Sequence, residues 1–197
     1  RPGDVILDVC AAPGGKALHA ADKLQGTGQV TACDVTAYKT EKIEENRDRL
    51  GLANVSVRVQ DARMRDETLI GAADVLLADV PCSGLGVIGK KQDIKYRITR
   101  QSMDEIVCLQ KEILSNVVHY LKQDGVMIYS TCTMNLAENE EMVRWICETF
   151  DMEPESMARF LPEALRREAE KGYLQLLPGV HETDGFFLAR LRRKVRG

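Results

Sequence analysis

The chain has 197 residues, and 44% of them are hydrophobic, which is enough to build one domain with a sizeable core. A formal net charge of −3 excludes a protein whose whole surface is a basic nucleic-acid interface, so any such contact must be local. No apolar run reaches the roughly 18 residues of a membrane span, and no secretory signal opens the chain. We therefore expect a cytoplasmic protein that contacts no membrane.

Strands and helices are predicted to alternate along the chain. Apolar runs predict strands at residues 5–9, 29–33, 55–59, 73–80, 126–129 and 185–191. Apolar positions at helical spacing and stop signals predict helices at residues 16–24, 38–50, 103–121 and 135–150. In the last helix, Asn135 and Glu138 are expected to form a capping box. This order favours parallel strands joined by right-handed crossovers, while residues 155–175 are ambiguous.

Polar side chains and cysteines follow the predicted strands at their carboxyl ends. Open α/β sheets bind ligands beyond these ends, where the strand order reverses. If the first, fourth and fifth predicted strands are neighbours, four of these side chains can reach one pocket. The four are Lys16, Asp79, Cys82 and Cys132.

A glycine-rich loop after the first strand narrows the class of ligand. Cys10 stands where a phosphate-binding P-loop has its first glycine, and adjacent Gly14 and Gly15 do not fit the dinucleotide spacing. A nucleoside cofactor without a pyrophosphate fits better, with Asp34 accepting from ribose hydroxyls and Asp61 from an adenine amino group. The loop then approaches the amino-acid part of S-adenosylmethionine.

The two cysteines at strand ends, Cys82 after Pro81 and Cys132 after Thr131, indicate covalent chemistry. Carbon 5 of cytosine is a poor nucleophile, so its methylation needs a thiolate that first adds to carbon 6. A methyltransferase acting on amino groups needs no thiol at this position. Spacing alone does not decide which cysteine is the nucleophile.

These motifs resemble the Sun-type RNA (cytosine-5)-methyltransferases, especially the bacterial small-subunit ribosomal RNA methyltransferase B group. The matching segments are residues 8–16, 79–83, 93–96, 130–132 and 184–189. The resemblance implies a class I, Rossmann-like α/β fold with a mostly parallel seven-stranded sheet, helices on both faces and an antiparallel C-terminal strand. It also implies that residues 1–197 are one methyltransferase catalytic domain, from a longer protein whose N-terminal RNA-binding domain lies outside this chain.

The resemblance further implies a role for each catalytic residue. Cys132 would be the nucleophile, Cys82 would assist product release, and Lys16 would lie near the cofactor or the base. Asp79 would contact the cytosine ring edge and must be protonated to donate to N3. The cofactor, S-adenosylmethionine, would be held by Cys10, Ala11, Ala12, Pro13, Gly14, Gly15, Lys16, Asp34, Lys39, Asp61 and Asp79.

The expected partner is RNA, with 16S ribosomal RNA first and transfer RNA as the alternative. A basic loop with Tyr96 available for stacking is either an RNA contact or a solvated loop. Its basic residues are Lys90, Lys91, Lys95, Arg97 and Arg100. Rival interpretations are a DNA or small-molecule methyltransferase and a non-catalytic, cofactor-binding RNA scaffold. A monomer without a metal ion is expected, since the six cysteines and three histidines show no ligand spacing.

Overall fold

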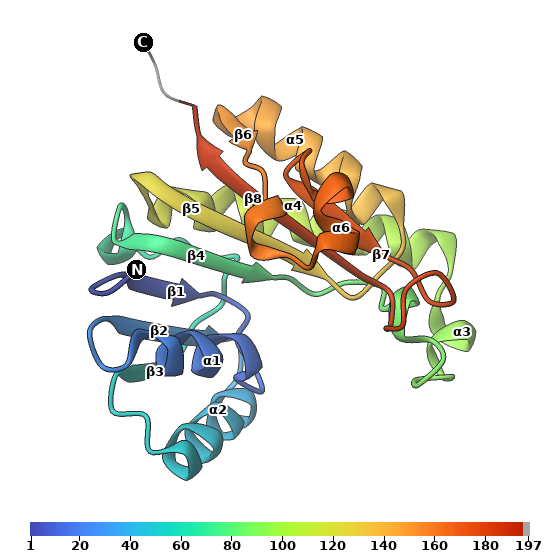
Figure 1. Ribbon diagram of the computed structural model, residues 1–197. Coiled ribbons are helices and arrows are strands. Elements are labelled where there is room, and N and C mark those ends of the chain that lie inside the picture. Colours follow the sequence, from blue (N-terminus) through green and yellow to red (C-terminus); the bar gives the residue numbers. More distant parts are fainter. Residues whose placement is uncertain (195–197) are drawn as a thin grey trace. The chain divides into compact units, whose positions relative to one another are not determined.

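Eight strands form the sheet in residues 1–194, the part of the chain that the computed structural model describes (Figure 1). Their order is β3-β2-β1-β4-β5-β8-β6, and β7 pairs with β8. The strands are β1 Val5–Asp8, β2 Gln29–Asp34, β3 Val55–Val59, β4 Ala73–Asp79, β5 Leu121–Thr131, β6 Met152–Pro154, β7 Tyr173–Leu176 and β8 Phe186–Arg193.

The sheet confirms the predicted mixed α/β architecture and corrects its strand number. β1 pairs in parallel with β2 and β4, and β2 with β3, as crossover connections require. β6 and β7 both run antiparallel to β8. The sheet therefore has eight strands instead of the seven that the resemblance implied. The apolar runs predicted only six, because the short β6 and β7 carry no apolar run long enough to stand out in the sequence.

The helices follow the predicted alternation. They are α1 Gly15–Leu24, α2 Ala37–Leu50, α3 Ile94–Arg97, α4 Arg100–Val117, α5 Glu140–Phe150 and α6 Glu163–Ala169. Single 3-10 turns occupy η1 Glu67–Leu69, η2 Leu85–Val87, η3 Val118–Tyr120, η4 Leu136–Glu138 and η5 Ala158–Phe160. The segment 155–175, which the sequence left ambiguous, thus contains η5, α6 and the start of β7.

The chain divides into two compact units that we describe separately. The first unit comprises Arg1–Asp79 and Ile113–Met127, and the second Val80–Glu112 and the chain from Ile128 onward. α4 and β5 contribute residues to both units. The organisation of residues 1–197 as one domain stays a prediction, and its last three residues lie outside the described part.

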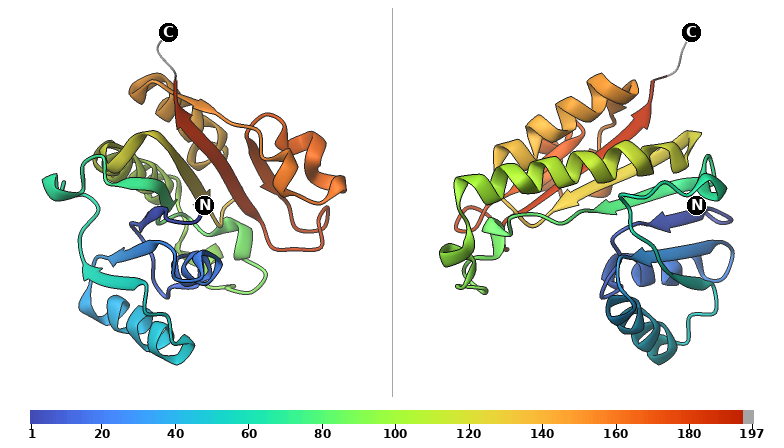
Figure 2. Two further views of the ribbon diagram at one scale, coloured as in Figure 1. Left: turned by 60° about the vertical axis from the view of Figure 1, so that its left-hand side comes forward. Right: turned by 180° about the vertical axis from the view of Figure 1, so that it is seen from behind.

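In the first unit, α1 packs on β1 and β2, and α2 packs on β2 and β3 (Figure 2). α1 buries one stripe of small and branched side chains, namely Ala17, Leu18, Ala21 and Leu24. These meet Val30 and other buried residues of the strands in one apolar cluster. Removing this surface from water fixes the strand ends from which the polar side chains project.

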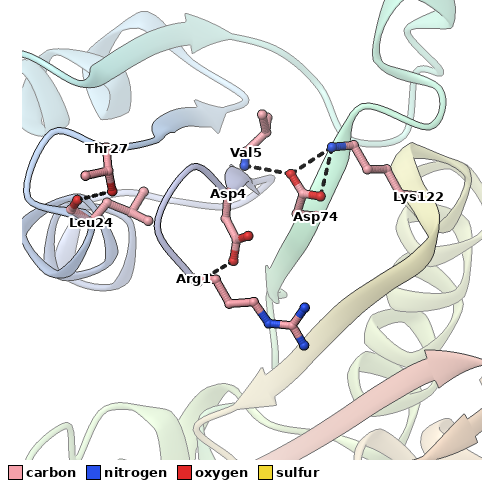
Figure 3. Close-up of polar contacts among 7 residues, drawn as sticks. All are labelled: Arg1, Asp4, Val5, Leu24, Thr27, Asp74 and Lys122. Atoms are coloured by element: carbon pink, nitrogen blue, oxygen red, sulfur yellow. Dashed lines mark hydrogen bonds and ion pairs between the residues drawn. The ribbon is translucent and has the colours of Figure 1, made fainter.

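Asp74 joins three strands of the first unit at the edge opposite their carboxyl ends (Figure 3). Its carboxylate accepts from the backbone N–H of Val5 in β1 at 2.8 Å and from Nζ of Lys122 in β5, with each oxygen at 2.8 Å from that nitrogen. The backbone of β1, which starts at Val5, is thereby tied to β4 before it reaches the glycine-rich loop.

The sequence predicted a helix to residue 121 and a strand only from residue 126, but β5 begins at Leu121 and includes Asp124 and Gly125. A Cβ atom on Gly125 would lie 3.0 Å from the carbonyl oxygen of Ala73. The glycine therefore serves a close approach of two backbones, a role that glycine also has within strands.

The predicted capping box is also wrong. Asn135 caps only η4, where its Oδ1 accepts from the N–H of Ala137 at 3.2 Å, and α5 starts later, at Glu140. Glu138 does not bond back to the N–H of Asn135, because its side chain is fully buried and engaged elsewhere.

Among residues 1–194, no helix is both long and apolar enough to cross a membrane.

Candidate active site

The glycine-rich loop wraps the carboxyl end of β2. The N–H of Ala11 donates to the carbonyl oxygen of Cys33 at 2.8 Å, and the N–H of Ala12 donates to Oδ2 of Asp34 at 3.0 Å. Gly14 has a φ of 108°, in a region that other residues rarely adopt. A Cβ atom on Gly15 would meet nothing within 4 Å, so the backbone faces open space where α1 begins.

Asp34, at the end of β2, is held in one orientation by three donors. Besides Ala12, the N–H of Val35 donates to Oδ1 at 2.8 Å, and Nζ of Lys39 lies 3.0 Å from the same oxygen. The aspartate side chain is 5% exposed and the lysine side chain 48%. Lys39 and Asp34, both members of the predicted cofactor set, are thus in direct contact.

Lys16 and Asp79 form an ion pair, with Nζ at 2.6 Å from Oδ2. Their side chains are 40% and 32% exposed, so solvent can reach both. The lysine ammonium thus occupies Oδ2 of the carboxylate. Donation from Asp79 to N3 of cytosine, which needs the protonated acid, stays a prediction and requires this pair to open.

Asp61, after β3, is bonded to Arg63. Nε and Nη2 of Arg63 lie 3.0 and 2.6 Å from Oδ1 and Oδ2, and the N–H of Arg63 donates to Oδ1 at 2.9 Å. These bonds from Arg63 hold the pKa of Asp61 below its ordinary value. The predicted hydrogen bond from an adenine amino group must therefore reach a lone pair of the Asp61 carboxylate that Arg63 does not already occupy.

Asp8 is a site residue that we did not assign a role from the sequence. It ends β1, is 1% exposed, and accepts from the N–H of Cys10 at 3.3 Å. Burial raises the pKa of Asp8 to about 7, and the charges of Asp79 and Asp34 act in the same direction. The sequence did offer a signal, because Asp8 ends its strand in the same way as Asp34 and Asp79 end theirs.

The second unit brings Cys82 and Cys132 together. Their sulfur atoms are 3.2 Å apart, and the N–H of Cys132 points at Sγ of Cys82 at 3.3 Å. Both are free thiols of intermediate exposure. The hydrogen bond with Cys132, and burial after it, raise the pKa of Cys82 far above its ordinary value. Cys82 is thus suited to remain a thiol beside a Cys132 thiolate.

Three further cysteines, Cys10, Cys33 and Cys147, also have raised pKa values. Burial raises the pKa of Cys33 to about 12 and that of Cys147 to about 11, and it also raises the pKa of Cys10. An apolar setting keeps such thiols protonated and unreactive. Cys10 therefore contributes backbone to the glycine-rich loop and has no sign of nucleophilic function.

Glu138 is the second residue that sequence reasoning missed. Its carboxylate accepts from the N–H and Oγ of Ser83 at 2.8 and 2.5 Å, from Nδ2 of Asn135 at 2.9 Å, and from Nε2 of Gln110 at 3.2 Å. Gln110, the polar interruption of the apolar face of α4, also donates to the carbonyl oxygen of Pro81 at 2.9 Å. That interruption was the available signal, since a fully buried amide needs partners.

Two glycines lock the loop after Cys82 in place. The N–H of Gly86 donates to the carbonyl oxygen of Cys132 at 2.9 Å, and the N–H of Gly185 donates to the carbonyl oxygen of Gly86 at 2.8 Å. A Cβ atom on Gly86 would lie 2.1 Å from the oxygen of Gly185, a distance that no packing tolerates. Only glycine fits at this crossing of backbones.

The basic loop lies in the second unit around α3. Nζ of Lys90 is 2.6 Å from Oδ2 of Asp184, and Arg97 lies 3.6 Å from Asp93, so part of the positive charge is balanced. Tyr96 is 80% exposed, with Nζ of Lys95 at 4.8 Å from its ring centre.

Residues 1–194 contain no cluster of three side chains able to hold a metal ion.

The fold, with its glycine-rich loop and acidic strand ends, is the Rossmann-like fold of methyltransferases that use S-adenosylmethionine. The crystal structure of NSun6 from Pyrococcus horikoshii with SFG has a TM-score of 0.82 to this chain and 34% sequence identity. The alignment covers 96% of this chain and 48% of that chain.

A family model for the 16S rRNA methyltransferase RsmB/F matches residues 1–192, and the chain belongs to this family. The probable ribosomal RNA small subunit methyltransferase B of Bacillus subtilis is 40% identical over 197 residues, covering 98% of this chain and 44% of the relative. The ribosomal RNA small subunit methyltransferase F of Pectobacterium atrosepticum is 36% identical over 194 residues, covering 98% and 40%. The resemblance predicted from the motifs is confirmed, and the chain spans less than half the length of these relatives.

Proposed function

We propose that the protein methylates carbon 5 of a cytosine in 16S ribosomal RNA, with S-adenosylmethionine as methyl donor and Cys132 as nucleophile. Family membership supports the reaction and the RNA class. The observation that carries the mechanism is the 3.2 Å separation of the Cys82 and Cys132 sulfur atoms. A methyltransferase without covalent chemistry has no use for two adjacent thiols.

The residues of the first unit fit the proposed cofactor. The methionine part of S-adenosylmethionine carries an ammonium, a carboxylate and a sulfonium, and the loop offers acids, a lysine and backbone bent at Gly14. Asp34, with one acceptor site beyond its three donors, would bind the ribose. Lys16 and Asp79 form an exposed pair that can exchange partners when a charged ligand arrives. When bound, the cofactor supplies an electrophilic methyl group.

The thiols would carry out the remaining steps. The Cys132 thiolate adds to carbon 6 of the target cytosine, which makes carbon 5 a nucleophile. After carbon 5 has gained the methyl group, its proton leaves to a base and the bond between sulfur and carbon 6 breaks, so the aromatic ring is restored. Cys82, whose pKa is raised, keeps the proton that can return to the departing sulfur of Cys132. The base must first be unstacked from the RNA.

The test is a denaturing gel of the full-length protein with Cys82→Ala or Cys132→Ala, after incubation with S-adenosylmethionine and unmodified 16S ribosomal RNA. We expect a stable protein–RNA adduct with Cys82→Ala, because addition occurs and release is slow. Cys132→Ala should give no adduct and lose several orders of magnitude in rate. The reverse pattern would make Cys82 the nucleophile, and methyl label outside 5-methylcytosine would reject the proposed reaction.

Matched incubations with unmodified transfer RNA test the substrate. We expect 5-methylcytosine in the ribosomal RNA only, and label confined to transfer RNA would overturn that choice. The cytoplasmic location and the monomeric state stay predictions.

A further inference from the structure

We infer that Glu138 is a positioning residue that holds Cys82 and Cys132 at their working distance. Glu138 acts through the side chains that follow the two thiols in the chain, a role that rests on the proposed functions of those thiols. We call the group formed by Ser83, Thr133 and Glu138 the thiol clamp.

The first arm of the clamp fixes the Cys82 loop. Ser83 follows Cys82 directly, and both its polar groups reach the same carboxylate: the N–H donates to Oε2 of Glu138 at 2.8 Å and Oγ donates to Oε1 at 2.5 Å. Two bonds from one residue to two oxygens of one side chain determine the orientation of that residue. The backbone that carries Cys82 therefore has little freedom to rotate.

The second arm fixes the Cys132 loop. Thr133 follows Cys132 directly, and its Oγ1 is 2.7 Å from Oγ of Ser83. The same Oγ1 accepts from the N–H of Asn135 at 3.2 Å, while Nδ2 of Asn135 donates to Oε1 of Glu138 at 2.9 Å. The residues after both thiols are thus joined to each other and to one carboxylate.

The three residues of the thiol clamp are buried, which restricts their movement. Glu138 and Thr133 are fully buried and Ser83 is 5% exposed. The carboxylate is surrounded by four neutral donor groups, from Ser83, Asn135 and Gln110. A buried charge is costly unless every oxygen is bonded, so the loops can move only by breaking several bonds together.

Holding the thiols matters for the proposed reaction, because one must attack carbon 6 while the other stays within reach of the same sulfur. A misplacement of about 1 Å in such a site can cost on the order of 100-fold in rate. The capping role that the sequence suggested for Glu138 would have no such effect on the thiols.

The first measurement compares Glu138→Gln with Glu141→Gln, an exposed glutamate on the following helix. Diamide, a two-electron oxidant, takes two electrons and two protons from a thiol pair as the S–S bond forms. Peptide mass spectrometry then reports how fast Cys82 and Cys132 become linked. We expect Glu138→Gln to slow this linkage about tenfold, because the amide has one acceptor oxygen and loses bonds to both loops, with Glu141→Gln unchanged. An unchanged linkage rate in folded Glu138→Gln would overturn the inference.

Circular dichroism and the melting temperature show whether each variant is folded. If Glu138→Gln does not fold, Ser83→Ala provides the test, since it removes only the hydroxyl bonds to Glu138 and Thr133. It should slow the linkage by a smaller factor, and a rate equal to the parent would contradict the clamp.

The second measurement is steady-state methylation by the full-length variants. We expect kcat to fall on the order of 100-fold with Glu138→Gln while KM for RNA changes little, as for lost positioning. A slower linkage with no methylation by the parent would leave the clamp standing and reject the proposed function. Normal kcat together with slow linkage would overturn the clamp as a catalytic device.

Discussion

Asp8 in the first unit and Glu138 in the second are both almost completely buried near candidate functional residues, but they accept different numbers of hydrogen bonds. Asp8 in the first unit accepts one backbone N–H, from Cys10, and its pKa is raised to about 7 by burial. Glu138 in the second unit accepts four hydrogen bonds from uncharged groups. Hydrogen-bond donors replace the lost water for a charged group, while burial without them favours the neutral acid.

The polar groups around the two carboxylates also differ in charge and exposure. In the first unit the pairs of Lys16 with Asp79 and of Lys39 with Asp34 include partly exposed lysines, which can exchange partners at low cost. In the second unit the contact between the hydroxyl groups of Ser83 and Thr133 is buried. The partly exposed ion pairs suit the proposed binding of a charged cofactor, whereas the buried contacts of the thiol clamp favour one fixed geometry.

The largest expected effect concerns Asp8. Its folded-state pKa lies above the ordinary value of 3.8, so its stabilising contribution is complete below about pH 4 and is lost as the pH rises through about 7. Asp8→Asn removes the ionisable group and therefore this loss. As the pH rises from 4 to 8, the free energy of unfolding of the variant should increase by up to about 4 kcal/mol relative to that of the parent. Urea unfolding across this range measures the difference. The exposed Asp22→Asn is the control, and parallel pH curves for Asp8→Asn and the parent would contradict the contrast between the two carboxylates.

A smaller effect is expected from Gln110→Leu in the thiol network. The change leaves the carbonyl of Pro81 and one oxygen of Glu138 short of a donor in a buried site. The free energy of unfolding should fall by about 2 kcal/mol. Gln101→Leu, on the exposed side of the same helix, should change it by less than about 0.5 kcal/mol. Equal midpoints for the two variants in urea would mean that the network adds no rigidity.

The smallest effect concerns Asp61 on the cofactor side. Asp61→Ala should weaken S-adenosylmethionine binding by about 1 kcal/mol, the low end for a lost hydrogen bond, because Arg63 already uses much of the carboxylate. Titration calorimetry measures the affinity. Arg63→Ala, which keeps the carboxylate, should bind at least as tightly as the parent. Unchanged affinity in Asp61→Ala would remove Asp61 from the cofactor site.

The sequence predicted those parts that follow from periodic apolar patterns and from local motifs. The parallel strands, the long helix around Gln110 and the two cysteine motifs all belong to this group. The capping box at Asn135 failed because a local pattern competed with a tertiary one: Glu138 bonds to Ser83, far away in the chain, instead of to its own helix start. The start of β5 was predicted too late for a similar reason, since Gly125 in its first half lies against Ala73, which is distant in sequence.

The site was predicted residue by residue, but its internal pairing was not. Nothing in the sequence indicates that Arg63 occupies the carboxylate of Asp61, or that Asp8 has a single backbone donor. Whether the cofactor residues and the thiols share one pocket stays a prediction, because they belong to separate units.

The crossing of Gly86 with Gly185 has a consequence for how this protein can diversify. The backbone amide of Gly86 holds the carbonyl of Cys132, and Gly185 holds Gly86 in turn. A loop library intended to change substrate choice can vary the exposed residues around Tyr96 freely, yet any side chain at position 86 would force apart the segments that carry the two thiols. Selection for new specificity would therefore retain glycine at positions 86 and 185 while the exposed residues of the loop change.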